Sequence, residues 1–238
     1  MITLAIDSST ARLVVGLVRV PDAPEQGGEA ARQPAPTASH AHVLAQRVLD
    51  DARRHNEALV PAIADVLGRA GLGYADIEAV TCGCGPGPFT GLRVGMATAA
   101  ATADSLGVPL RGVCSLDAMA VDPAWRGVGN PARVIASDAR RREVYWAAYD
   151  AAGSRVIGPE VCKPAALPAA ELERIGVRAV SAPEGLVLGE WAQPLERLEV
   201  WPTAQTLCAA PTVDFRPIYL RRPDAVAPRV RVSEALCQ

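Results

Sequence analysis

Two segments of the chain share one pattern: an aliphatic run, an aspartate that begins a polar turn, and a second aliphatic run. Residues 4–18 read LAIDSSTARLVVGLV, and residues 135–150 read IASDARRREVYWAAYD. Aliphatic and β-branched runs on both sides of a short polar turn predict a β-hairpin. Hairpins are common, so the match alone leaves coincidence and internal duplication equally open. A duplication would make each copy the start of one lobe, with the second lobe shortened.

The other predicted elements indicate an α/β fold. We expect strands at 2–7, 12–19, 77–84 and 109–114, and helices at 56–70 and 90–106. Apolar residues of the first helix recur at the spacing of one buried face, Asn56 is its expected N-cap, and Gly71 ends it. Residues 42–50 fit a helix or a strand equally by periodicity. This order predicts a mixed sheet covered by helices.

Composition limits what the chain can bind. Its 238 residues include 24 basic and 26 acidic side chains, a net charge of −2, which predicts no broad affinity for nucleic acid. Residues 21–39 are rich in proline and glycine and predict a flexible hairpin insertion. No apolar run approaches the ~20 residues of a membrane span. The N-terminus lacks a basic stretch and a cleavage site, so we expect a cytoplasmic protein.

Two close cysteines raise the question of a zinc site. Cys82 and Cys84 have C-x-C spacing, and His40 and His42 have H-x-H spacing. Structural zinc sites usually combine two matched pairs with wider C-x₂₋₄-C spacing, and the chain offers no second such pair. We therefore expect both thiols to be small core residues.

The most distinctive motif is GCGPGPFTGLRVGM at 83–96, which joins a buried strand to a helix that we expect Thr90 to cap. A helix start of this kind suits a phosphate group. The glycine spacing does not match a dinucleotide fingerprint, and Leu92-Arg93 stands where a P-loop needs Lys-Ser/Thr. The candidate residues of this glycine-rich turn are Gly85, Pro86, Gly87, Thr90, Gly91 and Arg93.

The following helix has a stripe of small residues. Gly91, Gly95, Ala99 and Ala103 recur every four positions, which lets another element approach closely. One interpretation is packing against helix 56–70 within this fold. The other is that neighbouring faces of the two helices dock against helices of a partner protein, and both can hold together.

Catalytic groups are few. Asp7 and Asp138 lead the two polar turns, where a carboxylate can orient a metal-bound nucleotide. The alternative is that each closes its turn through its own backbone N–H bonds. No serine lies in a G-x-S-x-G elbow, and no set of acid, base and nucleophile stands out.

Five segments resemble motifs of the TsaB (YeaZ) family. They are MITLAIDSST at the start, HNEALVPAI at 55–63, GCGPGPFTGLRVG at 83–95, DARRREVYWAAY at 138–149 and PIYLR at 217–221. Pro88 replaces the usual serine, and the insertion at 21–39 is absent from shorter members. The Gly-Pro-Gly-x-Phe-Thr-Gly block is highly specific, and the matches run almost the whole chain. The family pattern makes residues 42–50 a third strand.

This resemblance implies an α/β, actin-like and ribonuclease H-like fold of two lobes, with mixed sheets flanked by helices. The N-terminal lobe would be residues 1–112, and a shortened C-terminal lobe residues 113–238. The residues that would correspond to vestigial phosphate loops are Asp7, Ser8, Ser9, Thr10 and Asp138.

The resemblance also implies a role in synthesis of threonylcarbamoyladenosine (t6A) at position 37 of tRNA. In that family TsaD transfers the threonylcarbamoyl group, TsaB is a non-catalytic scaffold and activator that dimerises with TsaD, and the ATPase TsaE joins the pair. The chain would meet tRNA indirectly, through the complex, and no membrane. Expected partner contacts are Asn56, Glu57, Leu59, Val60, Ile63, Gly95, Ala99 and Ala103. A homodimer through the same small-residue helix is the alternative for the isolated chain.

A sequence difference bears on catalysis. TsaD-type proteins carry a His-x-x-x-His metal pair where this chain reads VCSLDAMA (113–120), which places Ser115 and Met119 at the two histidine positions. A hydroxyl and a thioether are poor substitutes for two imidazoles, so we expect no metal, no cofactor and no transferase activity alone. Weak ATP or ADP binding remains open. The competing hypothesis is an enzyme acting alone, either an actin-like ATP-binding protein or a glycoprotease-like peptidase.

Overall fold

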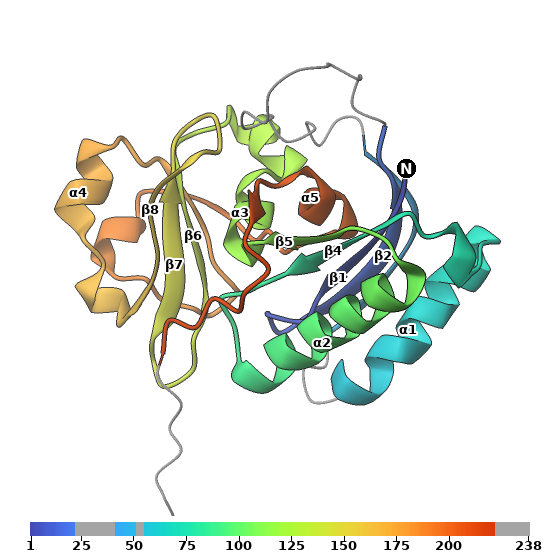
Figure 1. The fold of residues 1–238 in the computed structure, drawn as a ribbon. Coiled ribbons are helices and arrows are strands. Elements are labelled where there is room, and N and C mark those ends of the chain that lie inside the picture. The colour runs from blue at the N-terminus through green and yellow to red at the C-terminus, as the bar shows by residue number, and fades with distance from the viewer. Residues whose placement is uncertain (22–40, 51–54, 222–238) are drawn as a thin grey trace, which may run out of the picture.

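The computed structural model describes residues 1–21, 41–50 and 55–221, so the predicted insertion lies almost entirely outside the described residues. Two mixed sheets form the framework (Figure 1). The first contains β1 (Ile2–Asp7), β2 (Leu13–Arg19), β3 (His42–Leu49), β4 (Ala79–Gly83), β5 (Leu110–Val113) and β11 (Thr212–Val213). The second contains β6 (Arg133–Asp138), β7 (Val144–Tyr149), β8 (Arg155–Cys162), β9 (Ala179–Ser181) and β10 (Glu196–Leu198).

The two sheets repeat one strand order. The first runs β11-β5-β4-β1-β2-β3, and the second runs β10-β9-β6-β7-β8. In each, three consecutive strands pair antiparallel, and the first of them continues into two parallel strands on its other side. Strands β6 to β10 therefore match β1 to β5 one for one. This correspondence favours duplication over coincidence as the origin of the two similar hairpins.

Helices α1 (His55–Ala70) and α2 (Phe89–Leu106) lie side by side on one face of the first sheet (Figure 1). Leu59 and Ile63 of α1 and Leu92 and Ala99 of α2 are buried in the core between helices and sheet. A short helix, α4 (Ala169–Arg174), contributes to the core of the second sheet. The predicted mixed sheets flanked by helices are confirmed. No helix in the described ranges is long and apolar enough to span a membrane.

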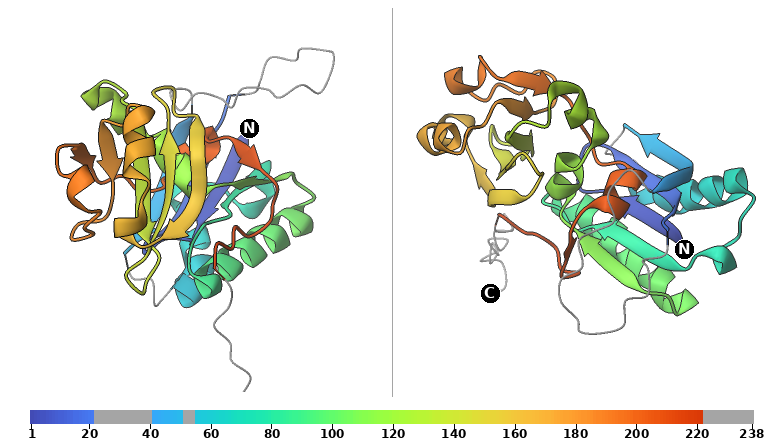
Figure 2. Two further views of the ribbon diagram at one scale, coloured as in Figure 1. Left: turned by 90° about the vertical axis from the view of Figure 1, so that its left-hand side faces the viewer. Right: turned by 90° about the horizontal axis from the view of Figure 1, so that it is seen from above.

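Two short helices cross between the sheets. Helix α3 (Ser115–Ala120) follows the first sheet but packs on β6 and β7, whereas α5 (Ala204–Ala209) follows the second sheet but packs on β1 and β2. The two helices also contact each other, and seen from above they lie between the lobes (Figure 2). Strand β11 then pairs with β5. Residues 204–213 thus join the first sheet, which the predicted boundary after residue 112 does not account for.

Two predicted helix caps are wrong. Helix α1 begins at His55, so Asn56 lies inside the helix instead of capping it, and its side chain is outside the described part of the structure. Helix α2 begins at Phe89, because Pro88 is the last residue with extended backbone angles, and Thr90 therefore lies within the first turn. Gly71 takes a left-handed φ of 67° at the end of α1, as predicted. Residues 42–49 form the strand that the resemblance implied.

The small-residue stripe of α2 faces the interior. Gly95, Ala99 and Ala103 are buried, and a Cβ atom on Gly95 would overlap the Ser8 hydroxyl in the turn after β1. Helix α2 packs mainly on β4 and to a smaller extent on α1, so the stripe serves chiefly to bring α2 close to the sheet. The stripe therefore packs within the fold, but chiefly against the sheet and the Ser8 turn and not, as expected, against helix 56–70.

We predict that Gly95→Ala lowers the free energy of unfolding by about 1–3 kcal/mol, because the added methyl group meets Ser8 in a packed site. The matched control is Gly68→Ala in α1, where no atom lies within 4 Å of the position that a Cβ would take. That change should raise stability by about 0.5–1 kcal/mol, since alanine is the better helix former. Urea unfolding of both variants measures the contrast. Equal effects of the two changes would contradict close packing at Gly95.

Candidate functional site

The turn after β1 is centred on a buried carboxylate. Asp7 has no exposed surface, and its Oδ1 accepts a 2.8 Å bond from the backbone N–H of Ser9. The Ser115 hydroxyl donates to Asp7 Oδ2 over 2.5 Å. The single proton of the Ser9 hydroxyl has two acceptors within 2.8 Å, Asp7 Oδ1 and Ser115 Oγ. The carboxylate of Asp7 is therefore held by protein donors on both of its oxygens.

The glycine-rich turn encloses this cluster. A Cβ atom on Gly83 would overlap the Asp7 carboxylate, and one on Gly87 would overlap the backbone carbonyl of Ser9. Gly85 has a φ of 94°, a conformation that favours glycine, and its carbonyl accepts a 2.8 Å bond from the Ser115 N–H. These glycines bring the turn against the protein's own backbone. The motif thus has a structural explanation that needs no phosphate.

The second aspartate turn is open. Asp138 is about half exposed; its Oδ1 accepts a 2.7 Å bond from the Arg140 N–H, and its Oδ2 lies 3.6 Å from Arg140 Nη1. Arg140, Arg141 and Arg142 all take positive φ values, between 55° and 63°. Asp138 therefore closes its own turn, which is the alternative that the sequence left open. The two aspartates occupy matching positions on β1 and β6, but only Asp7 is sealed.

The two residues at the positions of the TsaD-type histidines are both buried. Ser115 bonds Asp7, and Met119 packs in the core beneath the second sheet. Among those residues, no group of three or more His, Cys, Asp or Glu side chains is arranged to hold a metal ion.

Cys82, Cys84 and Cys114 behave as core residues. Burial raises the pKa of Cys82 well above its ordinary value, with Cys84 and Asp7 adding to the shift. Burial likewise raises the pKa of Cys84 to about 11 and that of Cys114 to about 12. Such thiols stay protonated at neutral pH, and a protonated thiol is a poor nucleophile and a poor metal ligand. Their burial agrees with the expected role of Cys82 and Cys84.

The C-terminal motif PIYLR contacts the glycine-rich block, a link that sequence reasoning missed. The Arg93 side chain donates a 2.8 Å bond to the Tyr219 hydroxyl, and the rings of Phe89 and Tyr219 lie 4.8 Å apart. Further on, Arg221 pairs with Glu143 in the turn after β6. Residues 214–221, which we call the strap, therefore run from the first lobe to the second (Figure 1). The sequence offered one signal for this contact, because it contains both the glycine-rich block and the C-terminal PIYLR motif of the same family.

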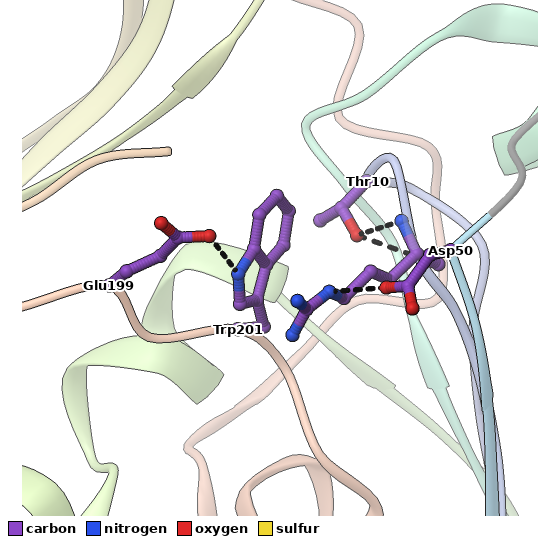
Figure 3. A network of polar contacts seen from close by, with 5 residues as sticks. Thr10, Asp50, Glu199 and Trp201 are labelled. Carbon is purple, nitrogen blue, oxygen red and sulfur yellow. Dashed lines mark hydrogen bonds and ion pairs between the residues drawn. The ribbon is translucent and has the colours of Figure 1, made fainter. Parts of the chain in front are cut away.

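A second connection between lobes lies beside the Asp7 turn. The Arg12 guanidinium lies 4.6 Å from the ring centre of Trp201 and pairs with Asp50 over 2.8 Å. The Trp201 indole donates to Glu199, and the Thr10 hydroxyl exchanges hydrogen bonds with the backbone of Arg12 (Figure 3). Thr10, predicted as a phosphate-loop residue, here organises the turn that carries Arg12. Ser8 similarly donates to the Gly91 carbonyl over 2.8 Å.

The predicted partner contacts divide by exposure. Five of these residues are buried within the first lobe and cannot contact a partner in this structure: Leu59, Ile63, Gly95, Ala99 and Ala103. The reason is that each faces the sheet from its helix. Glu57 and Val60 are exposed on α1, and Val60 is 57% accessible. Their role in partner binding stays a prediction.

Comparison with known proteins identifies the family. Residues 42–194 match the family model described as "TsaD: tRNA N6-adenosine threonylcarbamoyltransferase". The uncharacterised protein ML0378 of Mycobacterium leprae is 42% identical over 94% of this chain, which spans 56% of the length of ML0378. TsaB of Escherichia coli is 41% identical over 97 residues, 41% of this chain and 42% of that protein. The chain belongs to the TsaB (YeaZ) family.

A solved structure agrees with this membership. A Pseudomonas aeruginosa protein described as similar to peptidase YEAZ superposes with a TM-score of 0.66 at 26% identity, covering 92% of this chain and 99% of that one. The resemblance noted from the five motifs is confirmed, as is the actin-like fold class.

We predict that Asp7→Ala lowers the free energy of unfolding by about 2–4 kcal/mol, because the Ser9 N–H and the Ser115 hydroxyl lose their acceptor in a buried site. Asp138→Ala is the matched change in the second turn and should cost under about 1 kcal/mol, since water can replace an exposed partner. Urea unfolding compares the two. A cost for Asp7→Ala as small as that for Asp138→Ala would show that Asp7 does not stabilise the fold.

Proposed function

We propose that this protein is a non-catalytic scaffold and activator in the synthesis of threonylcarbamoyladenosine at position 37 of tRNA, acting as the partner of a TsaD-type transferase. Family membership and relatives named as tRNA threonylcarbamoyladenosine biosynthesis protein TsaB support the pathway. The observation that carries the non-catalytic role is the sealed Asp7 turn. Its carboxylate is fully buried and bonded to Ser9 and Ser115.

A catalytic role would need groups that the turn does not make available. A metal-bound phosphate needs carboxylate oxygens free to approach the ion, and both oxygens of Asp7 accept protein hydrogen bonds. A serine nucleophile must be reached by its substrate, and Ser9 and Ser115 are buried, at 2% and 0% exposure. The peptidase and kinase alternatives therefore lack a specific observation in their favour.

The outer face of α1 and α2 is the surface we propose for the transferase. It combines Val60 and Ala64 of α1 with Ala97 and Ala101 of α2, all exposed. These four side chains are small or aliphatic, because the large apolar residues of both helices, such as Leu59 and Leu92, point into the core. Small exposed side chains let partner helices approach closely, which the buried stripe cannot do. The proposed interface therefore lies on the outward sides of α1 and α2, whereas most of the partner contacts expected from the sequence lie on their inward sides.

Other members of the assembly follow from the family alone. We propose that the ATPase TsaE binds the pair and that tRNA meets this chain through the complex. A homodimer through the α1–α2 face is the competing state of the isolated chain. Mixing the isolated chain with the transferase tests whether the complex of the two proteins replaces the homodimer.

We predict that Val60→Asp weakens binding to the transferase by about tenfold or more, because it places a charge in the middle of an apolar contact. The control is Val187→Asp, an equally apolar and 75% exposed position on the second lobe. Calorimetric titration of both variants with the purified transferase gives the affinities. If both variants bind as the parent does, the α1–α2 face is not the interface.

The non-catalytic role has its own test. We expect the purified chain to turn over neither ATP nor peptide, and to raise t6A formation when added to the transferase. Steady turnover by the chain alone would contradict the scaffold role whatever the binding data show.

A further inference from the structure

A small cavity lies at the opposite end of the first sheet from Asp7. It has a volume of about 120 Å³ and lies between the strands β1, β4 and β5 and the end of α5. Its polar wall consists of Thr3, Thr81, Arg111 and Cys208. Thr81 and Arg111 are direct neighbours in the β4–β5 register. No role assigned above uses these four side chains.

Two polar atoms of this wall are buried without a partner among the described residues. They are the hydroxyl of Thr3, whose residue is 2% exposed, and Nε of Arg111. A buried unpaired donor of this kind costs about 1–3 kcal/mol, so folded proteins rarely retain one without compensation. Both residues line the same cavity, which makes a shared ligand a simple explanation for both unpaired groups.

The charge of Arg111 is also uncompensated. Its Nη2 donates to the backbone carbonyls of Leu207 and Cys208 at the end of α5, over 3.3 and 2.7 Å. No carboxylate of the described residues pairs with it. Burial lowers the pKa of Arg111, because a desolvated cation without a counter-charge is unfavourable. Cys208 supplies no counter-charge, since burial raises its pKa to about 12 and keeps the thiol neutral.

A second arginine, Arg133, is buried, and its side-chain nitrogens all make hydrogen bonds. Arg133 binds the end of α3 much as Arg111 binds the end of α5. All three nitrogens of Arg133 donate to the carbonyls of Ala120 and Pro131, and its guanidinium lies 5.0 Å from the ring centre of Trp125. Arg133 also has Asp150 as a nearby negative charge. An arginine that binds a helix end can therefore use the donors on all three of its nitrogens, so the unpaired Nε of Arg111 needs another explanation.

We propose that this cavity is a binding site for a small oxyanion, held by Arg111 Nε and the Thr3 hydroxyl. The guanidinium supplies the charge, and a hydroxyl and a neutral thiol add donors. The volume admits an anion of four or five heavy atoms and is well below the roughly 300–1,000 Å³ of sites for larger ligands. Inorganic phosphate and hydrogencarbonate both satisfy this chemistry. The site is independent of the proposed role in tRNA modification.

The test is anion-dependent stability. Thermal unfolding of the full chain is followed with increasing phosphate, or increasing hydrogencarbonate, against chloride at the same ionic strength. The anion that binds should raise the unfolding temperature of the parent protein, because it binds only the folded state. Comparison of the two titrations identifies the anion, and chloride controls for general screening.

Thr3→Val identifies the site, because valine keeps the shape and removes the hydroxyl. It should reduce the apparent affinity for the anion by about tenfold, the effect of one lost hydrogen bond of ~1.4 kcal/mol to a charged group. The matched control is Thr102→Val on α2, whose hydroxyl bonds the Thr98 carbonyl away from the cavity. This control should keep the parent's anion dependence.

Two outcomes would overturn the proposal. One is a parent protein whose unfolding temperature responds to neither anion beyond the chloride control. The other is an anion response that Thr3→Val leaves unchanged, since the anion would then bind elsewhere. In both cases the cavity would hold only solvent, and Thr3→Val should stabilise the fold equally with and without anion.

Discussion

The structure depends on the exchange of two short helices between its sheets. Helix α3 belongs by sequence to the first lobe and packs on the second, and α5 does the reverse. A six-residue helix has little stability of its own, so each must be fixed by the sheet that receives it. Arg133 binds the C-terminal carbonyl of α3, and Arg111 binds those of α5. These two arginines place positive charge where the helix dipoles favour it.

Helix α3 also explains why the Asp7 turn is sealed. Its first residue, Ser115, bonds Asp7 of the first sheet, while Asp117 two residues later accepts a 2.8 Å bond from Tyr149 of the second. Burial raises the pKa of Asp117, and the nearby Arg155 guanidinium opposes that shift. One buried turn of helix thus carries a polar contact to each lobe. Ser115 thus fills its position with a structural hydrogen bond to Asp7.

The parts of this fold that the sequence predicted are those with strong local signals. Both hairpins, α1 and α2 have clear periodicity and turn residues, and the motif family supplied β3. Strands β9 and β10 have three residues each, too few for any period to appear, and their parallel pairing depends on contacts distant in the chain. The return of residues 204–213 to the first sheet was not predictable for the same reason.

Prediction of the candidate site from the sequence is limited in a different way. Gly95, Ala99 and Ala103 were recognised as a close-approach surface, but spacing cannot tell which neighbour approaches. A stripe facing a sheet and one facing a partner have the same sequence. Likewise, Asp7 and Asp138 lead similar turns, and Ser115 together with the glycine-rich turn buries Asp7, whereas Asp138 stays about half exposed. Tertiary context decides the function of such residues.

The links between lobes bear on how the protein works. Enzymes that close two lobes around a ligand need a hinge, and their lobes separate to admit it. Here the exchanged helices join the lobes through the core, while the strap pairs Arg221 with Glu143 and Arg12 stacks on Trp201 at the surface. Opening would have to break all of these contacts together. A framework of this kind is suited to presenting one fixed helical face, such as the outer side of α1 and α2, where Val60, Ala64, Ala97 and Ala101 are exposed.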